Sequence, residues 1–182
     1  MKATGIVRRI DELGRIVIPK EIRRTMRIRE SDPLEIYTDR DGTIILKRYS
    51  PVAELKTLAE GLAASIAQVC ANTAFISDRE RVIACFGALK RVLEDGRLSK
   101  TVQNIILQRK PFTSTPDAIV LTELCEGQDR KFFEVSIQPI VANGDAIGAV
   151  GLICTDPATP IEEGHRQILR TVSLYIGREL QD

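Results

Sequence analysis

The first fifty residues of this 182-residue chain carry more apolar side chains than so short a segment can bury. Two stretches rich in Ile and Val, Thr4–Ile10 and Arg15–Ile18, flank Leu13-Gly14 and are predicted to be strands. A domain of about fifty residues is marginal by itself, and this one has no cysteine or histidine to hold a metal. We therefore expect two copies to share one core, which makes the segment a homodimer.

A short helix is predicted after these strands. Pro19 would open it, because proline at the first helical position loses only a donor that the helix does not need. Ile22 and Met26 are four residues apart and would share one face, which leaves Arg23 and Arg24 on the other.

A β-hairpin follows the helix. The strands Leu34–Thr38 and Thr43–Lys47 flank Asp39-Arg40-Asp41-Gly42, where Asp-Gly supplies the positive φ angles of a tight turn. The segment ends near Tyr49-Ser50-Pro51, so we place one domain at residues 1–50 and a second at residues 51–182.

The second domain begins with a predicted helix, for which Ser50 is the N-cap and Pro51 the first residue. Its large apolar residues recur every three or four positions, which suits packing along another helix, including one from a second subunit. Packing on the domain's own sheet stays open as the alternative. The stripe comprises Leu55, Leu58, Leu62, Ile66 and Val69.

The rest of this domain predicts an α+β fold with a largely antiparallel sheet. A helix is expected over Ser99–Gln108, and Asn143-Gly144 predicts a second hairpin. The last helix is expected to begin at Thr159-Pro160-Ile161-Glu162, with Thr159 as its N-cap. The predicted strands are Thr73–Ser77, Val82–Phe86, Ala118–Leu124, Phe132–Val141 and Ala146–Cys154.

The net charge of +1 hides a strong asymmetry. Arginine holds phosphate in a bidentate manner and reaches guanine edges, and a dimer would repeat the basic set along duplex DNA. The opening stretch contains only three acidic residues, Asp11, Glu12 and Glu21, and the remainder of the chain carries a net negative charge. The basic residues there are Lys2, Arg8, Arg9, Arg15, Lys20, Arg23, Arg24, Arg27 and Arg29.

The residue patterns of catalytic, metal and cofactor sites are missing. His165 is the single histidine, and Gly144, Gly148 and Gly151 do not form a dinucleotide-binding motif; they suit a turn and close packing in a strand. We predict no catalytic residue, no metal, no cofactor, no membrane span and a cytoplasmic location. The cysteines are far apart and are expected to be buried and unpaired: Cys70, Cys85, Cys125 and Cys154.

The stretch from Met1 to Arg24, and above all its core LGRIVIPKEIR at residues 13–23, resembles the AbrB family of bacterial transition-state regulators. The resemblance extends to about Tyr49. It implies a swapped-hairpin β-barrel, formed by two chains that exchange hairpins, and binding of double-stranded DNA. The family's DNA-contacting arginines match Arg8, Arg15, Arg23 and Arg24, and we add Arg9 and Lys20.

The stretch Pro139–Val150 is similar to the late strands of the GAF domain found in some AbrB-family members. This resemblance implies a regulator of sporulation genes, acting as activator or repressor. It also implies a homotetramer, for which the Leu55–Val69 stripe and the terminal helix are the candidate contacts. No residue set selects a small-molecule ligand for the GAF-like domain, so its ligand is left open.

Two other functions remain open from the sequence. The chain could be an antitoxin, because swapped-hairpin modules also serve that role, although antitoxins of this kind usually continue into a short flexible tail. It could also be a ligand sensor whose basic module only oligomerises.

Overall fold

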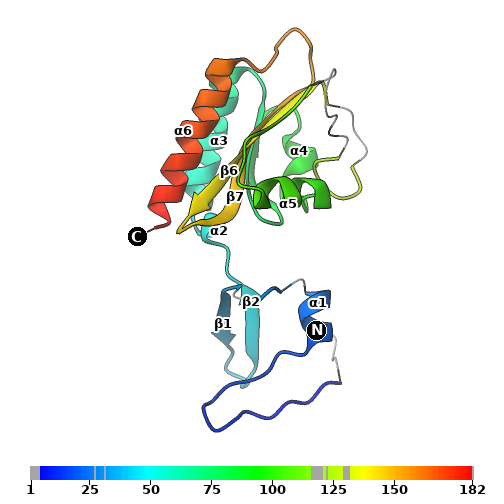
Figure 1. Cartoon of the computed structure of the whole chain (residues 1–182), viewed down its shortest axis with the longest axis vertical. Coiled ribbons are helices and arrows are strands. Elements are labelled where there is room, and N and C mark those ends of the chain that lie inside the picture. The colour runs from blue at the N-terminus through cyan, green and yellow to red at the C-terminus, as the bar shows by residue number, and fades with distance from the viewer. Residues whose placement is uncertain are drawn as a thin grey trace. The chain divides into compact units, whose positions relative to one another are not determined.

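The computed structural model describes residues 5–26, 28–30, 32–115, 121, 123–128 and 132–181. The chain divides into two compact units, Met1–Tyr49 and Ser50–Asp182 (Figure 1). The strand expected at Ala118–Leu124 lies largely outside the described residues, as do Lys2 and Arg27 of the predicted basic set.

The N-terminal unit contains the predicted β-hairpin. Strand β1 (Leu34–Thr38) pairs antiparallel with β2 (Ile44–Arg48). The connecting loop closes with a hydrogen bond from the Asp39 N–H to the Thr43 carbonyl, at 3.0 Å. Gly42 has a φ of 77°, a left-handed conformation that glycine adopts without steric cost.

Helix α1 (Lys20–Thr25) begins one residue later than expected. Pro19 is its N-cap, and the Pro19 carbonyl accepts the first helical hydrogen bond from the Arg23 N–H at 2.9 Å. Ile22 is half-buried, but Met26 is 57% exposed, and α1 buries none of its own residues. In the single chain, the predicted apolar face of this helix is therefore only partly covered.

The two strands expected at Thr4–Ile10 and Arg15–Ile18 are not strands in the single chain. Their described residues have no regular secondary structure and flank a turn, in which the Asp11 N–H donates to the Arg15 carbonyl at 3.0 Å. A strand needs a ladder of hydrogen bonds to a neighbouring strand, and the sheet described in this unit contains only β1 and β2. The apolar side chains here are exposed, up to 84% for Val7: Ile6, Val7, Ile10, Leu13, Ile16 and Val17.

The C-terminal unit is an α+β domain with a five-stranded sheet, as predicted. The strand order is β4-β3-β7-β6-β5, and every neighbouring pair is antiparallel. The sequence did not predict β5 or α4. The elements are α2 (Pro51–Glu54), α3 (Lys56–Cys70), β3 (Thr73–Asp78), β4 (Val82–Phe86), α4 (Lys90–Leu93), α5 (Lys100–Leu107), β5 (Phe112–Ser114), β6 (Glu134–Ala142), β7 (Asp145–Cys154) and α6 (Glu163–Glu179).

Helices cover both faces of this sheet. α3 and α6 lie side by side over one face, and α4 and α5 lie over the other (Figure 1). Because side chains alternate along a strand, Phe75 joins the core beneath α5 while Ala74 and Ile76 join the core beneath α3 and α6. The sheet thus separates two hydrophobic cores.

Two glycines of β7 permit close packing, as predicted. A Cβ on Gly148 would lie 2.1 Å from the Ser77 carbonyl oxygen, and one on Gly151 would lie 2.3 Å from the Phe75 ring. Any larger side chain at these positions would push β7 away from its neighbours.

Helix α3 packs on its own sheet, which was one of the two alternatives for it. The contact with the sheet uses mainly small residues. The predicted stripe of large apolar residues therefore lies partly outside it: Leu58 and Leu62 are half-buried, and Val69 is 67% exposed. The buried face consists of Ala59, Ala63, Ile66, Ala67 and Cys70.

The expected start of the last helix was wrong. Glu162, not Thr159, is the N-cap of α6: its side chain accepts from the His165 N–H, and the Glu162 N–H donates to His165 Nδ1 at 3.2 Å. Thr159 instead closes a turn by donating its N–H to the Asp156 carbonyl at 2.9 Å. The Ile161 N–H donates to the buried Glu134 at 2.9 Å. Of these, the Ile161–Glu134 hydrogen bond is the tertiary contact, and it keeps the chain out of the helix until Glu163.

Candidate nucleic-acid interface

The predicted DNA-binding residues lie on three segments of the N-terminal unit, and all of them are exposed. Arg8 and Arg9 belong to the extended segment before the Asp11 turn, and Arg15 follows that turn. Lys20, Arg23 and Arg24 lie on α1. Because these side chains are exposed, phosphates can reach their charged groups, which would not hold for isolated buried cations.

Asp11 organises the turn that presents Arg15. Its carboxylate accepts the N–H of Leu13 at 3.0 Å and the N–H of Arg15 at 2.8 Å. It also accepts the Arg15 guanidinium Nε–H at 2.8 Å. The Arg15 backbone N–H, then its side chain, lower the pKa of Asp11, because these donors stabilise the charged carboxylate. Asp11 therefore holds the turn and orients Arg15.

This role of Asp11 was not predicted from the sequence, in which Asp11 is one of the few acidic residues of the basic stretch. A signal was present, because aspartate commonly accepts hydrogen bonds from backbone N–H groups two residues or more ahead in a turn. The sequence around it, Asp11-Glu12-Leu13-Gly14, ends in a glycine with a φ of 76°.

The cations of α1 have few competing partners. Arg23 and Arg24 lie in its last turn, where positive charge favours the helix dipole. Arg8 donates to the neighbouring Val7 carbonyl at 3.2 Å. Within the described ranges, no ion pair engages Arg9, Lys20, Arg23 or Arg24, and no hydrogen bond connects the residue 8–15 segment to the α1 cations.

The groups that could support catalysis or metal binding are buried or scattered. All four cysteines are free and buried, as predicted. Burial raises the pKa of Cys85 to about 12 and that of Cys125 to about 11, which leaves them as neutral thiols. Across the described part of the chain, no cluster of His, Cys, Asp and Glu could hold a metal ion. No helix built from described residues is both long and apolar enough to cross a membrane.

Both units of the chain match models of known protein families. A model described as stage V sporulation protein T C-terminal, transcription factor, matches residues 54–181. A model described as the antidote-toxin recognition MazE bacterial antitoxin matches residues 7–54. Stage V sporulation protein T of Bacillus subtilis (strain 168) is 41% identical over 181 residues, covering 100% of this chain and 99% of that protein.

The N-terminal unit has further relatives. The transition state regulatory protein AbrB of Bacillus subtilis (strain 168) is 67% identical over 51 residues, which are 28% of this chain and 52% of that protein. A solution structure of its N-terminal DNA recognition domain is 67% identical, covers 28% of this chain and 94% of that domain, and has a TM-score of 0.25. The relation to AbrB thus rests on the sequence.

The C-terminal unit has the GAF fold. A GAF domain/HD domain protein from Geobacter sulfurreducens superposes with a TM-score of 0.53 over 69% of this chain and 91% of that one. The identity is 15%, so the likeness concerns the fold alone.

The sequence relationship to stage V sporulation protein T and to AbrB defines a DNA-binding transcription regulator, not an enzyme. The chain belongs to the family of stage V sporulation protein T. The resemblance and the fold class predicted from the sequence are therefore confirmed.

Proposed function

We propose that the chain regulates sporulation genes in the cytoplasm by binding double-stranded DNA as a dimer through residues 1–50. Residues 51–182 supply further oligomerisation and ligand sensing in this proposal. The DNA-contacting residues are Arg8, Arg9, Arg15, Lys20, Arg23 and Arg24.

The observation that carries this proposal is the exposure of all six cations on a unit whose apolar side chains are also exposed. Solvated cations alone are common on protein surfaces. Here Arg8 and Arg9 lie directly between exposed apolar residues, Val7 on one side in the sequence and Ile10 on the other. In the proposed dimer, the second copy covers the exposed apolar side chains and leaves the cations to face phosphates.

Dimerisation follows from the same segment. Residues 5–10 and 15–18 are not assigned to a strand, and they expose Ile and Val side chains. A second copy that adds its own hairpin would complete the hydrogen-bond ladder and cover this apolar surface. The arrangement agrees with the swapped hairpins that the AbrB resemblance implies.

A tetramer through the GAF-like domains is the second part of the assembly that we propose. Val69 on α3 and Leu174 and Tyr175 on α6 are exposed apolar residues on the two helices that cover one face of the sheet. A helical contact between two such domains would bury them. Two DNA-binding dimers would then act as one regulator.

Fluorescence anisotropy on a labelled duplex, recorded over a salt series, tests the DNA-binding proposal. We expect the logarithm of affinity to fall with the logarithm of salt concentration with a slope on the order of −4 to −8, since several phosphates are neutralised per dimer. Arg15→Ala should weaken binding and flatten the slope.

Arg91→Ala is the matched control, because Arg91 is an exposed arginine on α4 of the other unit. It removes the same charge without touching the proposed surface and should leave affinity within about twofold. Equal losses in the two variants, or a flat salt dependence, would refute DNA binding through these residues.

The antitoxin alternative is less well supported. The antitoxin model matches residues 7–54 only, whereas residues 50–182 form a compact domain with two cores instead of a flexible tail. The other alternative, a sensor whose basic module only oligomerises, predicts that Arg15→Ala preserves DNA-dependent output, which the same titration tests.

A further inference from the structure

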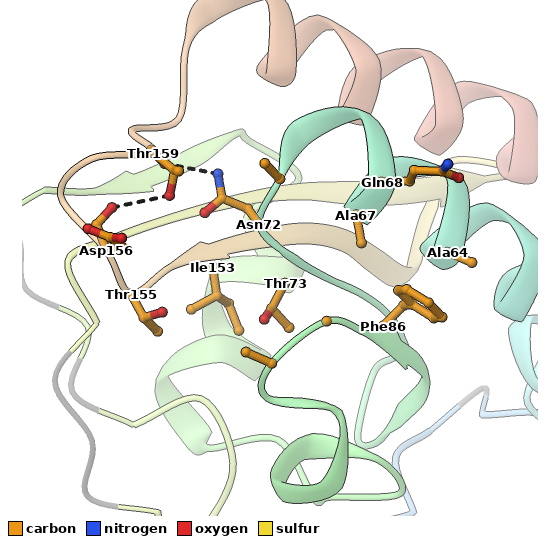
Figure 2. A pocket seen from close by; sticks show the side chains of 13 residues that line it. Ala64, Ala67, Gln68, Asn72, Thr73, Phe86, Ile153, Thr155, Asp156 and Thr159 are labelled. Carbon is orange, nitrogen blue, oxygen red and sulfur yellow. Dashed lines mark hydrogen bonds between the residues drawn. The ribbon is translucent and has the colours of Figure 1, made fainter.

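A cavity of about 440 Å³ opens beside the C-terminal half of α3 (Figure 2). It lies where β3 begins and where β4 and β7 end. Ala64 and Ala67 are three residues apart and share one face of α3, and Ala71 is the left-handed C-cap that follows the helix. Their small side chains leave the space that larger residues would fill. The volume lies within the range of small-molecule sites.

One end of the cavity is apolar. Phe86 and Ala64 lie together there (Figure 2). Phe86 ends β4 and is 46% exposed, although a phenylalanine normally lies in the core. Its ring and the adjacent alanines offer a surface on which a flat apolar group can pack.

The other end presents hydrogen-bond acceptors. Asn72 is buried, and its amide nitrogen donates to the carbonyls of Cys70 and Thr159, both at 3.0 Å. Its two hydrogens are thereby used, so the Asn72 side chain has only its oxygen left to offer. Asp156 accepts the Ala158 N–H with Oδ1 at 2.9 Å, which leaves Oδ2. Figure 2 shows Asn72, Asp156 and Thr159 grouped at this end.

The charge of the cavity is one-sided. The C-terminus of α3 at Cys70 brings the negative end of the helix dipole to the acceptor end. Asp156 adds a full negative charge, and none of the described lining residues is Lys, Arg or His. A carboxylate or phosphate would be repelled here. A protonated amine would be attracted and would find the acceptor oxygens of Asn72 and Asp156.

From this geometry we propose that the cavity binds an amphipathic organic cation, a protonated amine joined to a flat apolar group. The ammonium lies at Asp156 and Asn72, and the apolar group packs on Phe86. The inference deepens the ligand-sensing part of the proposed function, but its test requires neither DNA nor assembly. Because α3 forms one wall of the cavity, a bound ligand would contact the same helix that carries Val69, which we assigned to the tetramer contact.

Three probes with the same indole ring separate the contribution of charge to the binding affinity from that of apolar contact. Tryptamine carries an ammonium, tryptophol a neutral hydroxyl and indole-3-propionate a carboxylate. In calorimetric titrations of the full chain, we expect tryptamine to bind roughly tenfold more tightly than tryptophol, the scale of a charge-assisted hydrogen bond. Indole-3-propionate should bind more weakly than either.

Variants locate the binding. Asp156→Asn keeps the hydrogen bond to the Ala158 N–H and removes the charge, so it should weaken tryptamine roughly fivefold or more and leave tryptophol within about twofold. Asp145→Asn removes an exposed carboxylate at the opposite end of β7 and should change neither probe. Ala64→Leu fills the cavity and should abolish binding of both.

Three results would contradict binding of an organic cation in this cavity. Equal binding of the three probes, no saturable binding of tryptamine, or equal effects of Asp156→Asn and Asp145→Asn would each overturn the proposal. Thermal melting of each variant shows that it is folded, and Asp156→Asn keeps the test decisive if Ala64→Leu is unstable. DNA affinity of the same preparations, measured without probe, reports separately on the proposed DNA binding.

Discussion

Asp11 has two opposite effects on a DNA-binding surface, and their balance can be measured. Its negative charge repels phosphates, but its carboxylate holds the turn and the Arg15 side chain at 2.8 Å. We expect the positioning effect to dominate, because Asp11→Ala frees three hydrogen-bond donors of the turn at once. Anisotropy on a labelled duplex should therefore show several-fold weaker binding by Asp11→Ala.

Glu12→Ala provides the comparison for that prediction. Glu12 is the next residue, it is exposed, and it carries the same charge without the turn hydrogen bonds of Asp11. Its removal should leave DNA affinity unchanged or slightly increased, since only repulsion is lost. If Asp11→Ala also binds DNA more tightly, Asp11 acts only as a counter-charge.

The four thiols should be unreactive in the folded protein. Burial raises the pKa of Cys85 to about 12, so far less thiolate exists at pH 8 than for a free cysteine. A disulfide reagent such as DTNB at pH 8 should label almost none of the cysteines within minutes, and all four after unfolding in guanidinium. Rapid labelling of one thiol before unfolding would show that its burial is transient.

At the scale of elements, β7 depends on the absence of a side chain at Gly148. A Cβ there would lie 2.1 Å from the Ser77 carbonyl oxygen, which belongs to the backbone of the neighbouring strand and cannot rotate away. We expect Gly148→Ala to lower the free energy of unfolding by about 1–3 kcal/mol, the usual cost of overpacking. Urea denaturation measures the loss.

Gly164→Ala is the matched substitution in an open position. Gly164 lies in the first turn of α6, with no atom within 4 Å of an added Cβ. Alanine should stabilise this helix by up to about 1 kcal/mol, because it loses less backbone entropy than glycine. Equal effects of the two substitutions would mean that the β3–β7 contact relaxes to accept a methyl group.

The sequence predicted most elements, and its errors arose where tertiary contacts overrode local signals. Thr159-Pro160 has the pattern of a helix start, yet the buried Glu134 takes the Ile161 N–H and delays α6 until Glu163. Local patterns contain no information about Glu134, which is 27 residues away. Similarly, the large residues of α3 predicted its contact face, but small alanines allow the closest approach to the sheet.

The candidate site was predictable only in part. Charge and resemblance pointed to Arg8, Arg15, Arg23 and Arg24, whereas the role of Asp11 needed the geometry of the turn. The α3 cavity could not be predicted, because Asn72, Phe86 and Asp156 are brought together only by the sheet topology. Individually, each of them is an ordinary residue in the sequence.

At the scale of the whole molecule, the single chain exposes two separate apolar surfaces, one on each unit. The N-terminal unit exposes Val7 and Ile16, which lie next to the cations Arg8 and Arg15 in the sequence. The GAF-like unit exposes Val69 and Leu174 on its helical face. If each surface pairs with its own copy, both contacts are two-fold, and together they close a tetramer.

Single charge substitutions should break this assembly at one surface at a time. We expect wild type to sediment at about four times the chain mass of 20.2 kDa. Leu174→Asp should sediment at about twice the chain mass, and its DNA affinity per dimer should be retained. Val7→Asp should also halve the mass, but it should abolish DNA binding, because a buried charge opens the shared core that aligns the cations. Val7 is 84% exposed in the single chain, where such a substitution would be harmless. A fully active, tetrameric Val7→Asp variant would therefore show that the N-terminal unit does not dimerise through this segment.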